Sequence, residues 1–375
     1  MLPAPSVTKW GALAAMTQHP FKAALVGVLL LVSLVPAQAG PALLFEADSG
    51  RIYYAEDPDD HWYPASLTKI MTAYVTFTAL KAGKVMLDTK IKCSEAANAQ
   101  PPSKLGLPVG GEITIELALK SLIVKSANDV AVMLAEGVAG SEEAFVAEMN
   151  AAAKRLGMTR TNFVNPNGLP AAEQVTTARD LAILSKAVLR DFPEYAEYWT
   201  MVDVRIGKRR LGSHNGLLRT YEGADGLKTG FICDAGYNVV ASATRGGRRL
   251  MAVVLGEPSG SERSIRAASL LDHGFTVQGW KQILNSMTLE TLPLGTEARG
   301  PVSVRDDVIT WDCGGRARKR VVAKARDQKR AAAKKAKAAT ADVPAGNGSP
   351  GAGATAAVKP KPKTKSAAAP AETKP

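Results

Sequence analysis

Close to the start of the chain lies the segment Trp62-Tyr63-Pro64-Ala65-Ser66-Leu67-Thr68-Lys69-Ile70-Met71-Thr72-Ala73-Tyr74-Val75. Pro64 is favourable at the entry to a helix, and apolar residues follow it at helical spacing. Residues three apart on a helix share a face, with Cβ atoms about 5–6 Å apart. We therefore predict that Lys69 stands one turn above the Ser66 hydroxyl.

A serine and a lysine in this arrangement are a candidate nucleophile and base. A serine hydroxyl attacks poorly until a base removes its proton. A free lysine has a pKa of about 10.4, but burial or a second nearby cation would lower that pKa toward neutrality. The motif alone is unspecific, because Ser6-Val7-Thr8-Lys9 also fits Ser-x-x-Lys. The assignment therefore depends on the motifs that accompany Ser66 and Lys69.

Residues 1–39 have the pattern of a secretory signal peptide. Lys9 and Lys22 form a basic region, residues 23–35 form an apolar run, and a small-x-small cleavage pattern ends at Ala39. The run is too short to span a bilayer comfortably. We expect cleavage near Ala39 and a periplasmic or otherwise extracytoplasmic protein; an uncleaved membrane anchor is the alternative.

The basic charge of the chain is concentrated in its C-terminal tail. Residues 314–375 contain 16 of the 47 Lys and Arg but only 3 of the 35 Asp and Glu, which leaves residues 1–313 almost neutral. The tail is rich in Lys, Ala and Pro, so we expect it to be largely disordered. It is either a solvated extension or a segment that binds an anionic membrane surface or wall polymer. The neutral folded part predicts no nucleic-acid partner.

The order of the expected elements indicates an α+β fold. A hairpin is expected over 42–47 and 51–55, and loops over 90–111 and 161–176. Further strands are expected over 226–231, 237–243 and 250–255, and helices over 112–124, 129–136, 141–156, 177–190 and 261–275. In the last helix Ile265, Ala268, Leu271 and Phe275 fall near one face. We predict an antiparallel sheet built from both chain ends with the helices inserted, in one domain over 40–280 followed by a short segment over 281–313.

Ser126-Ala127-Asn128 is the second motif, at the end of an apolar helix. The Ser126 hydroxyl can both accept and donate a proton, so it can pass one to a leaving amine. Asn128 can hold a backbone amide of a substrate and can also tether Lys69.

Lys228-Thr229-Gly230 is the third motif, on an expected strand. Lys228 offers a cation for a substrate carboxylate and, by like-charge repulsion, would keep the first lysine neutral. Thr229 adds a hydroxyl to that carboxylate, and Gly230 would let the strand backbone come close to the substrate. The N–H groups of Ser66 and Phe231 are the predicted oxyanion hole.

The three motifs together resemble the low-molecular-weight penicillin-binding proteins, specifically the D-alanyl-D-alanine carboxypeptidases. The order of the motifs, their spacing and their flanking segments at 64–69, 225–230 and 235–238 all fit, and the resemblance covers about residues 41–275. It implies a β-lactamase/transpeptidase-like fold. It also implies hydrolysis of the terminal D-Ala–D-Ala bond of a peptidoglycan stem peptide through an acyl-enzyme on Ser66, and acylation by β-lactams. Arg263 falls where the family keeps an arginine near the substrate carboxylate; a solvated arginine at the start of the helix is the alternative.

Some features depart from the family. Ala127 stands where glycine is more common, the region after Phe275 is shorter than the usual second domain, and the basic tail replaces an amphipathic anchor helix.

A β-lactamase shares the motifs, but the stretch 173–177 lacks its Glu-x-x-Leu-Asn pattern. A D,D-endopeptidase acting on crosslinks, or a non-catalytic protein that binds the wall or membrane, remains open. Ser213-His214-Asn215 also fits Ser-x-Asn, but it lies too close to Lys228 and is interpreted as a loop.

Three cysteines, Cys93, Cys233 and Cys313, allow one disulfide. We predict that Cys233 and Cys313 pair in an oxidising compartment; three unpaired thiols are the alternative. The histidines and cysteines show no ligand spacing, so we predict no metal site and no cofactor.

Overall fold

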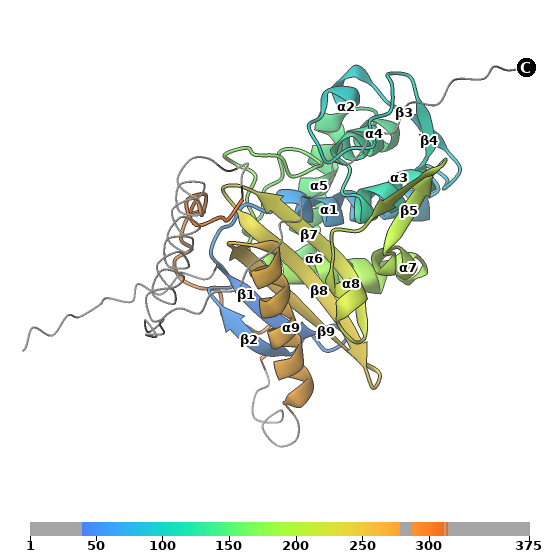
Figure 1. Cartoon of the computed structure of the whole chain (residues 1–375). Helices are drawn as coiled ribbons and strands as arrows, with labels where there is room; N and C mark the ends of the chain where they lie inside the picture. Colours follow the sequence, from blue (N-terminus) through green and yellow to red (C-terminus); the bar gives the residue numbers. More distant parts are fainter. Residues whose placement is uncertain (1–39, 278–286, 311–312, 314–375) are drawn as a thin grey trace, which may run out of the picture. The chain divides into compact units, whose positions relative to one another are not determined.

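The computed structural model describes residues 40–277, 287–310 and 313 (Figure 1). The predicted signal peptide and the basic tail lie outside the described residues. The chain divides into two units after Arg305. The sequence places the end of the main domain at residue 280, whereas in the structure residues 287–305 belong to the same unit as the sheet. The account below concerns this first unit.

A five-stranded antiparallel sheet joins the two ends of the unit, which confirms the predicted fold class. Its order is β2-β1-β9-β8-β7. The strands are β1 (Ala42–Glu46), β2 (Ile52–Glu56), β7 (Ala224–Ile232), β8 (Gly236–Arg245) and β9 (Arg248–Glu257). The N-terminal hairpin joins the C-terminal strands where β1 pairs with β9, Leu43 opposite Val253. β7, which carries the Lys228 motif, is therefore an edge strand.

The inserted region is helical. Its helices are η1 (Ala65–Thr68), α1 (Lys69–Lys81), α2 (Glu95–Ala99), α3 (Ile115–Val124), α4 (Asn128–Ala139), α5 (Glu142–Leu156), α6 (Ala178–Asp191), η2 (Pro193–Tyr195), α7 (Ala196–Thr200) and α8 (Leu217–Thr220). Side chains cap the N-termini of α5 and α6: Ser141 accepts from the Ala144 N–H, and Thr177 from the Asp180 N–H.

Two short antiparallel strand pairs were not predicted. One pairs β3 (Lys90–Lys92) with β4 (Glu112–Thr114), and the other pairs β5 (Asp203–Ile206) with β6 (Arg209–Gly212). The predicted loop 90–111 was therefore wrong in part, since it contains β3 and α2, and the predicted helix 112–124 begins as a strand. Runs of three residues carry too little periodicity to distinguish a strand from a loop.

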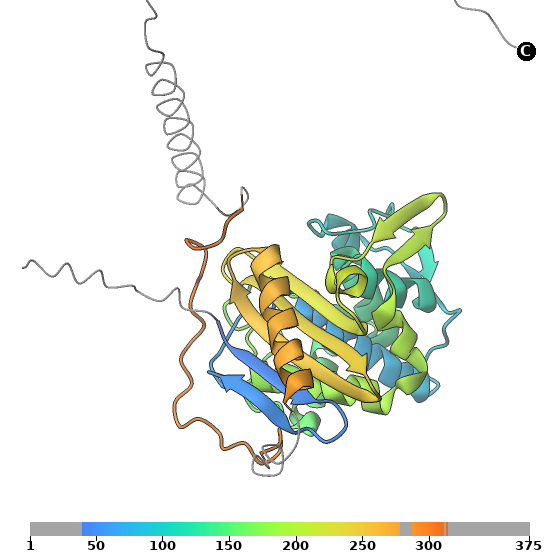
Figure 2. The same ribbon diagram turned by 60° about the horizontal axis from the view of Figure 1, so that its bottom comes forward.

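Helix α9 (Gly260–Thr276) covers one face of the sheet, and α6 packs on the opposite face (Figures 1 and 2). The buried face of α9 includes Ala267, Leu271 and Gly274. A Cβ on Gly274 would lie 2.7 Å from a Leu250 methyl group, so glycine lets the helix approach the strands closely. Ile265 does not share the buried face, because its side chain is 65% exposed.

Both cysteines of the predicted pair, Cys233 and Cys313, are disulfide-bonded, and Cys93 is a free thiol. Within the described residues no group of three or more His, Cys, Asp or Glu side chains is placed to hold a metal ion. Over the same residues no helix has both the length and the apolar character needed to cross a membrane.

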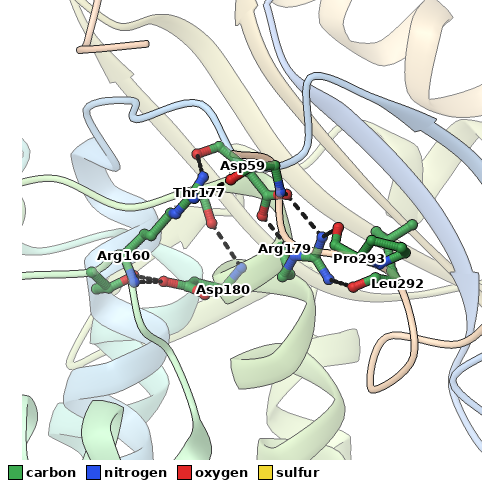
Figure 3. A network of polar contacts seen from close by, with 9 residues as sticks. Asp59, Arg160, Thr177, Arg179, Asp180, Leu292 and Pro293 are labelled. Atoms are coloured by element: carbon green, nitrogen blue, oxygen red, sulfur yellow. Dashed lines mark hydrogen bonds and ion pairs between the residues drawn. The ribbon is translucent and has the colours of Figure 1, made fainter. Parts of the chain in front are cut away.

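A buried ion pair joins α6 to the loop after β2 (Figure 3). The Arg179 guanidinium donates to both oxygens of Asp59, at 2.6 and 2.8 Å, and also to the carbonyls of Leu292 and Pro293, at 2.7 and 2.9 Å. Burial alone would raise the pKa of Asp59, but the hydrogen bonds from Arg179 and the Gly295 N–H hold it below its usual value. The pair therefore fixes the segment after residue 287 against α6.

We expect Arg179→Met to lower the free energy of unfolding by roughly 3–5 kcal/mol, because it leaves the Asp59 carboxylate buried without its partner. Urea denaturation measures the change. Arg190→Met is the matched control on the same helix, because the Arg190–Asp191 pair is exposed and should contribute at most about 1 kcal/mol. Equal losses in the two variants would contradict the assigned role of the buried pair.

Candidate active site

The predicted site residues converge on a cleft of about 580 Å³ beside the edge strand β7. Its lining includes the predicted residues Ser66, Ser126, Asn128, Thr229, Gly230, Phe231 and Arg263. The two lysines, Lys69 and Lys228, are buried and reach the hydroxyl groups from below the surface. Residues from η1, the α3–α4 bend, β7 and α9 thus meet in one place.

Ser66 lies in the 3₁₀ turn η1, immediately before α1, rather than in the α-helix itself. The Nζ atom of Lys69 is 3.0 Å from Ser66 Oγ. It donates to Asn128 Oδ1 at 2.8 Å and to the Asn167 carbonyl at 2.6 Å. A neutral amine has two N–H bonds, and these two acceptors engage both. Its lone pair is then left for the Ser66 hydroxyl, as a general base requires.

The environment favours the neutral form of Lys69. Its side chain is fully buried, and burial is the main cause that lowers its pKa well below the usual value. The charge of Lys228 lowers that pKa further, while Asp129 opposes the shift. The predicted repulsion between the two lysines is therefore present, but it is secondary to burial.

Ser126 and Lys228 form a second hydroxyl–amine pair. Lys228 Nζ donates to Ser126 Oγ at 2.8 Å and to the Thr229 carbonyl at 3.0 Å. Burial, followed by the charge of Arg263, lowers the pKa of Lys228 to about 7. Ser126 occupies the sharp bend between α3 and α4, with a positive φ of 60°. This bend directs its hydroxyl into the cleft instead of along the helix.

Asn128 makes the predicted tether to Lys69 through its carbonyl oxygen. Its amide nitrogen donates to the carbonyl of Pro101 at 2.9 Å, which leaves one N–H for a substrate amide. The sequence did not identify Asn167, whose backbone carbonyl holds Lys69. A backbone contact leaves no residue-type signature, and 161–176 showed only loop signals.

Gly230 also has a structural role that the sequence does not show. A Cβ at this position would lie 2.9 Å from the Pro64 carbonyl and 3.2 Å from the Ser66 N atom. Glycine is thus needed for β7 to pack against η1; its predicted role in bringing the strand backbone close to a substrate stays a prediction. Ser66 and Phe231 both line the cleft. The oxyanion hole formed by their N–H groups stays a prediction.

Arg263, from the first turn of α9, places a largely buried cation in the cleft. Its guanidinium lies 5.9 Å from the Tyr237 ring, and its Nε has no hydrogen-bond partner among the residues that the structure describes. Burial lowers its pKa to about 10, so it is charged at neutral pH. A buried and incompletely bonded guanidinium beside Thr229 suits a carboxylate.

His214 lies in the predicted loop and also lines the cleft. Burial of the imidazole is the main cause that lowers its pKa to about 4, and the charges of Lys228 and Lys125 lower it further. The imidazole is therefore neutral at pH 7. The only signal that could have identified it was its position shortly before β7. Asn215 of the same tripeptide is structural, since its amide donates to the Gly226 carbonyl at 3.1 Å.

Comparisons with known proteins agree with this geometry. Residues 32–259 match the family model of peptidase S11, described as D-alanyl-D-alanine carboxypeptidase. The chain is 35% identical over 244 residues to D-alanyl-D-alanine carboxypeptidase DacF of Bacillus subtilis, which covers 64% of this chain and 62% of the relative. It is 39% identical over 240 residues to DacC of Escherichia coli, covering 62% of this chain and 60% of the relative. The chain thus spans less than two thirds of the length of these relatives.

Solved structures show the same architecture. Penicillin binding protein 5 from Haemophilus influenzae is 38% identical, with a TM-score of 0.61 over 63% of this chain and 70% of that one. Penicillin-Binding Protein D2 from Listeria monocytogenes, in its ampicillin-bound form, is 31% identical, with a TM-score of 0.57 over 64% of this chain and 97% of that one.

Proposed function

The chain belongs to the D-alanyl-D-alanine carboxypeptidase family, and from this premise we propose that it is a serine-type D-Ala–D-Ala carboxypeptidase acting on peptidoglycan stem peptides. The observation that carries the proposal is the position of Lys69. Its fully buried amine lies 3.0 Å from the Ser66 hydroxyl and is held by two carbonyl oxygens. Burial lowers the pKa of this lysine well below its usual value, which favours the neutral amine that a general base requires.

In the proposed mechanism Ser66 Oγ attacks the carbonyl of the penultimate D-alanine while Lys69 accepts the hydroxyl proton. Ser126 Oγ, hydrogen-bonded to Lys228, passes that proton from Lys69 to the leaving amine, and free D-alanine departs as the C–N bond breaks. Water then attacks the Ser66 ester while Lys69, neutral again, takes a proton from it and returns that proton to Ser66 Oγ. The ester bond breaks, and the shortened peptide leaves with a free carboxyl group. A β-lactam follows the first step only, because its opened ring stays on Ser66.

Three residues hold the terminal carboxylate in this proposal. Lys228 and Arg263 supply positive charge, and Thr229 supplies a hydroxyl donor. The neutral imidazole of His214 adds no charge at pH 7.

Release of D-alanine from a purified disaccharide pentapeptide tests the proposal. We expect free D-alanine and a tetrapeptide product. Cleavage of crosslinked dimers without D-alanine release would instead identify a D,D-endopeptidase. Rapid turnover of the penicillin adduct would identify a β-lactamase, and an absence of every one of these reactions would leave a non-catalytic binding protein.

The two lysines predict a bell-shaped pH profile for acylation by a penicillin. The rate should rise on the acid side as Lys69 loses its proton. It should fall as pH passes through about 7 and above, because Lys228 then loses the charge that attracts the carboxylate. Acylation rates measured across the range check this. Lys228→Arg should extend activity to higher pH, since arginine stays protonated; an unchanged alkaline limb in this variant would contradict the assignment.

We also propose that the protein acts outside the cytoplasm, where its substrate would be found. The support is the pattern of residues 1–39. The basic tail is compatible with binding to an anionic membrane or wall polymer, and also with a solvated extension. Co-sedimentation of the full chain and of a chain ending at residue 313 with anionic vesicles and with purified walls distinguishes these two roles.

A further inference from the structure

The segment 287–305, here named the C-terminal strap, is fastened along the first unit. At its start the Ile52 N–H donates to the Met287 carbonyl and the Leu289 N–H donates to the Gly50 carbonyl, each at 2.9 Å. It is next held by the buried Arg179 pair (Figure 3). The strap therefore belongs to the structure of the domain and is not a loose linker.

The far end of the strap reaches the cleft. There it binds Asp234, in the turn between β7 and β8. The Val304 N–H donates to the Asp234 carbonyl at 3.0 Å, and Ser303 Oγ donates to its Oδ1 at 2.6 Å. Arg305 donates to both carboxylate oxygens, at 3.1 and 2.8 Å. These bonds from Arg305 and Ser303 lower the pKa of Asp234 and keep it ionised.

Asp234 and Arg305 are themselves part of the cleft wall. Their side chains are 31% and 49% exposed, so both remain accessible to a ligand. A second hollow of about 230 Å³ continues from this point, and it shares Pro170, Ile232 and Asp234 with the main cleft. The binding surface thus extends beyond the reacting groups, past the ion pair.

The edge position of β7 sets the direction in which a peptide would run. Its terminal carboxylate is expected at Lys228 and Thr229, near the start of the cleft. Its preceding residues can then lie antiparallel along β7, toward Asp234. At about 3.4 Å per residue, the three positions from Thr229 to Ile232, the end of β7, span roughly 10 Å, and Asp234 lies in the turn beyond them. A two-residue substrate would not reach the ion pair, whereas a longer stem peptide would.

We propose that the Asp234–Arg305 pair is a subsite for the upstream part of the peptide substrate, and that it makes the enzyme prefer long peptides to short ones. The inference rests on the proposed function for the identity of the substrate. The paired carboxylate and guanidinium offer an acceptor and donors to the backbone and polar side chains of an extended peptide. The strap supplies half of this subsite, so the short C-terminal region has a role in recognition.

The test compares kcat and KM for a pentapeptide ending in D-Ala–D-Ala and for N-acetyl-D-Ala–D-Ala. In Arg305→Ala, the ratio of kcat/KM for the long over the short peptide should fall about five- to tenfold, mainly through KM for the pentapeptide. Arg305→Lys should recover part of the ratio. Arg299→Ala is the matched control, because Arg299 fastens the same strap to Asp60 at 2.5 Å, away from the cleft lining.

An unchanged ratio in Arg305→Ala, or an equal fall in Arg299→Ala, would overturn the inference. A fall in kcat for both peptides alike would also overturn it, since that pattern indicates a general structural role.

Calorimetric binding of the pentapeptide to Ser66→Ala, with and without Arg305→Ala, separates this inference from the proposed function. Binding that weakens with Arg305→Ala, in a chain whose wild type releases no D-alanine, would support the subsite and refute the hydrolysis.

Discussion

Ser66→Ala is expected to abolish both D-alanine release and labelling by a fluorescent penicillin. The reason is chemical: without the hydroxyl no acyl-enzyme can form, and the hydroxyl of Ser126, which also lines the cleft, is paired with Lys228 rather than with Lys69. Gel fluorescence after incubation with the penicillin measures the labelling, and chromatography measures D-alanine.

Ser213→Ala is the matched control for this prediction. Ser213 belongs to the rejected Ser-x-Asn tripeptide, and its hydroxyl accepts a hydrogen bond from the Asn215 N–H. We expect this variant to be labelled as well as the wild type. Labelling of Ser66→Ala at the wild-type level would show that another residue is the nucleophile.

Lys69→Met is expected to slow acylation by a penicillin about 10²- to 10⁴-fold, the usual contribution of a positioned general base. The variant retains the bulk of the side chain but lacks a lone pair to accept the Ser66 proton. Lys69→Arg should be similarly slow, because arginine does not lose its proton in proteins. The second-order acylation rate constant, from a time course of labelling, measures both effects.

Lys81→Met is the matched control for Lys69→Met. It makes the same substitution on the same helix, but Lys81 is exposed at the end of α1. Its acylation rate should match that of the wild type. A Lys69→Arg variant that acylates at the wild-type rate would contradict the role of Lys69 as a base, because only the positive charge would then matter.

The site could be predicted from the sequence because its chemistry depends on side-chain types. Ser66 and Lys69 are separated by one helical turn, and the two other motifs add residue types that the proposed acyl transfer requires. The structure brings all nine predicted residues to one cleft or directly beneath it. Their roles in the reaction stay predictions until the variants are measured.

The missed contacts depend on the backbone or on tertiary partners. The Asn167 carbonyl that holds Lys69 has no signature in the sequence. The contact of Gly230 with η1 could not be predicted, because nothing in the local sequence shows that η1 packs against β7. The ion pairs of Arg179 and Arg305 join residues that are 120 and 71 positions from their partners.

Some elements of the fold could be predicted from the sequence, and others could not. Helices such as α5 and α6 have capping residues and long apolar faces, so their bounds could be placed to within about two residues. The β3–β4 and β5–β6 pairs have strands of three or four residues, and their pairing depends on surroundings that the sequence does not show.

Intact-protein and peptide mass spectrometry after reaction with a penicillin examines the arrangement of Ser66, Lys69 and Lys228 most directly. We predict one penicilloyl group per molecule, attached to Ser66. A modification on Ser126 or on any other residue, or no stable adduct together with no D-alanine release, would contradict the proposed site.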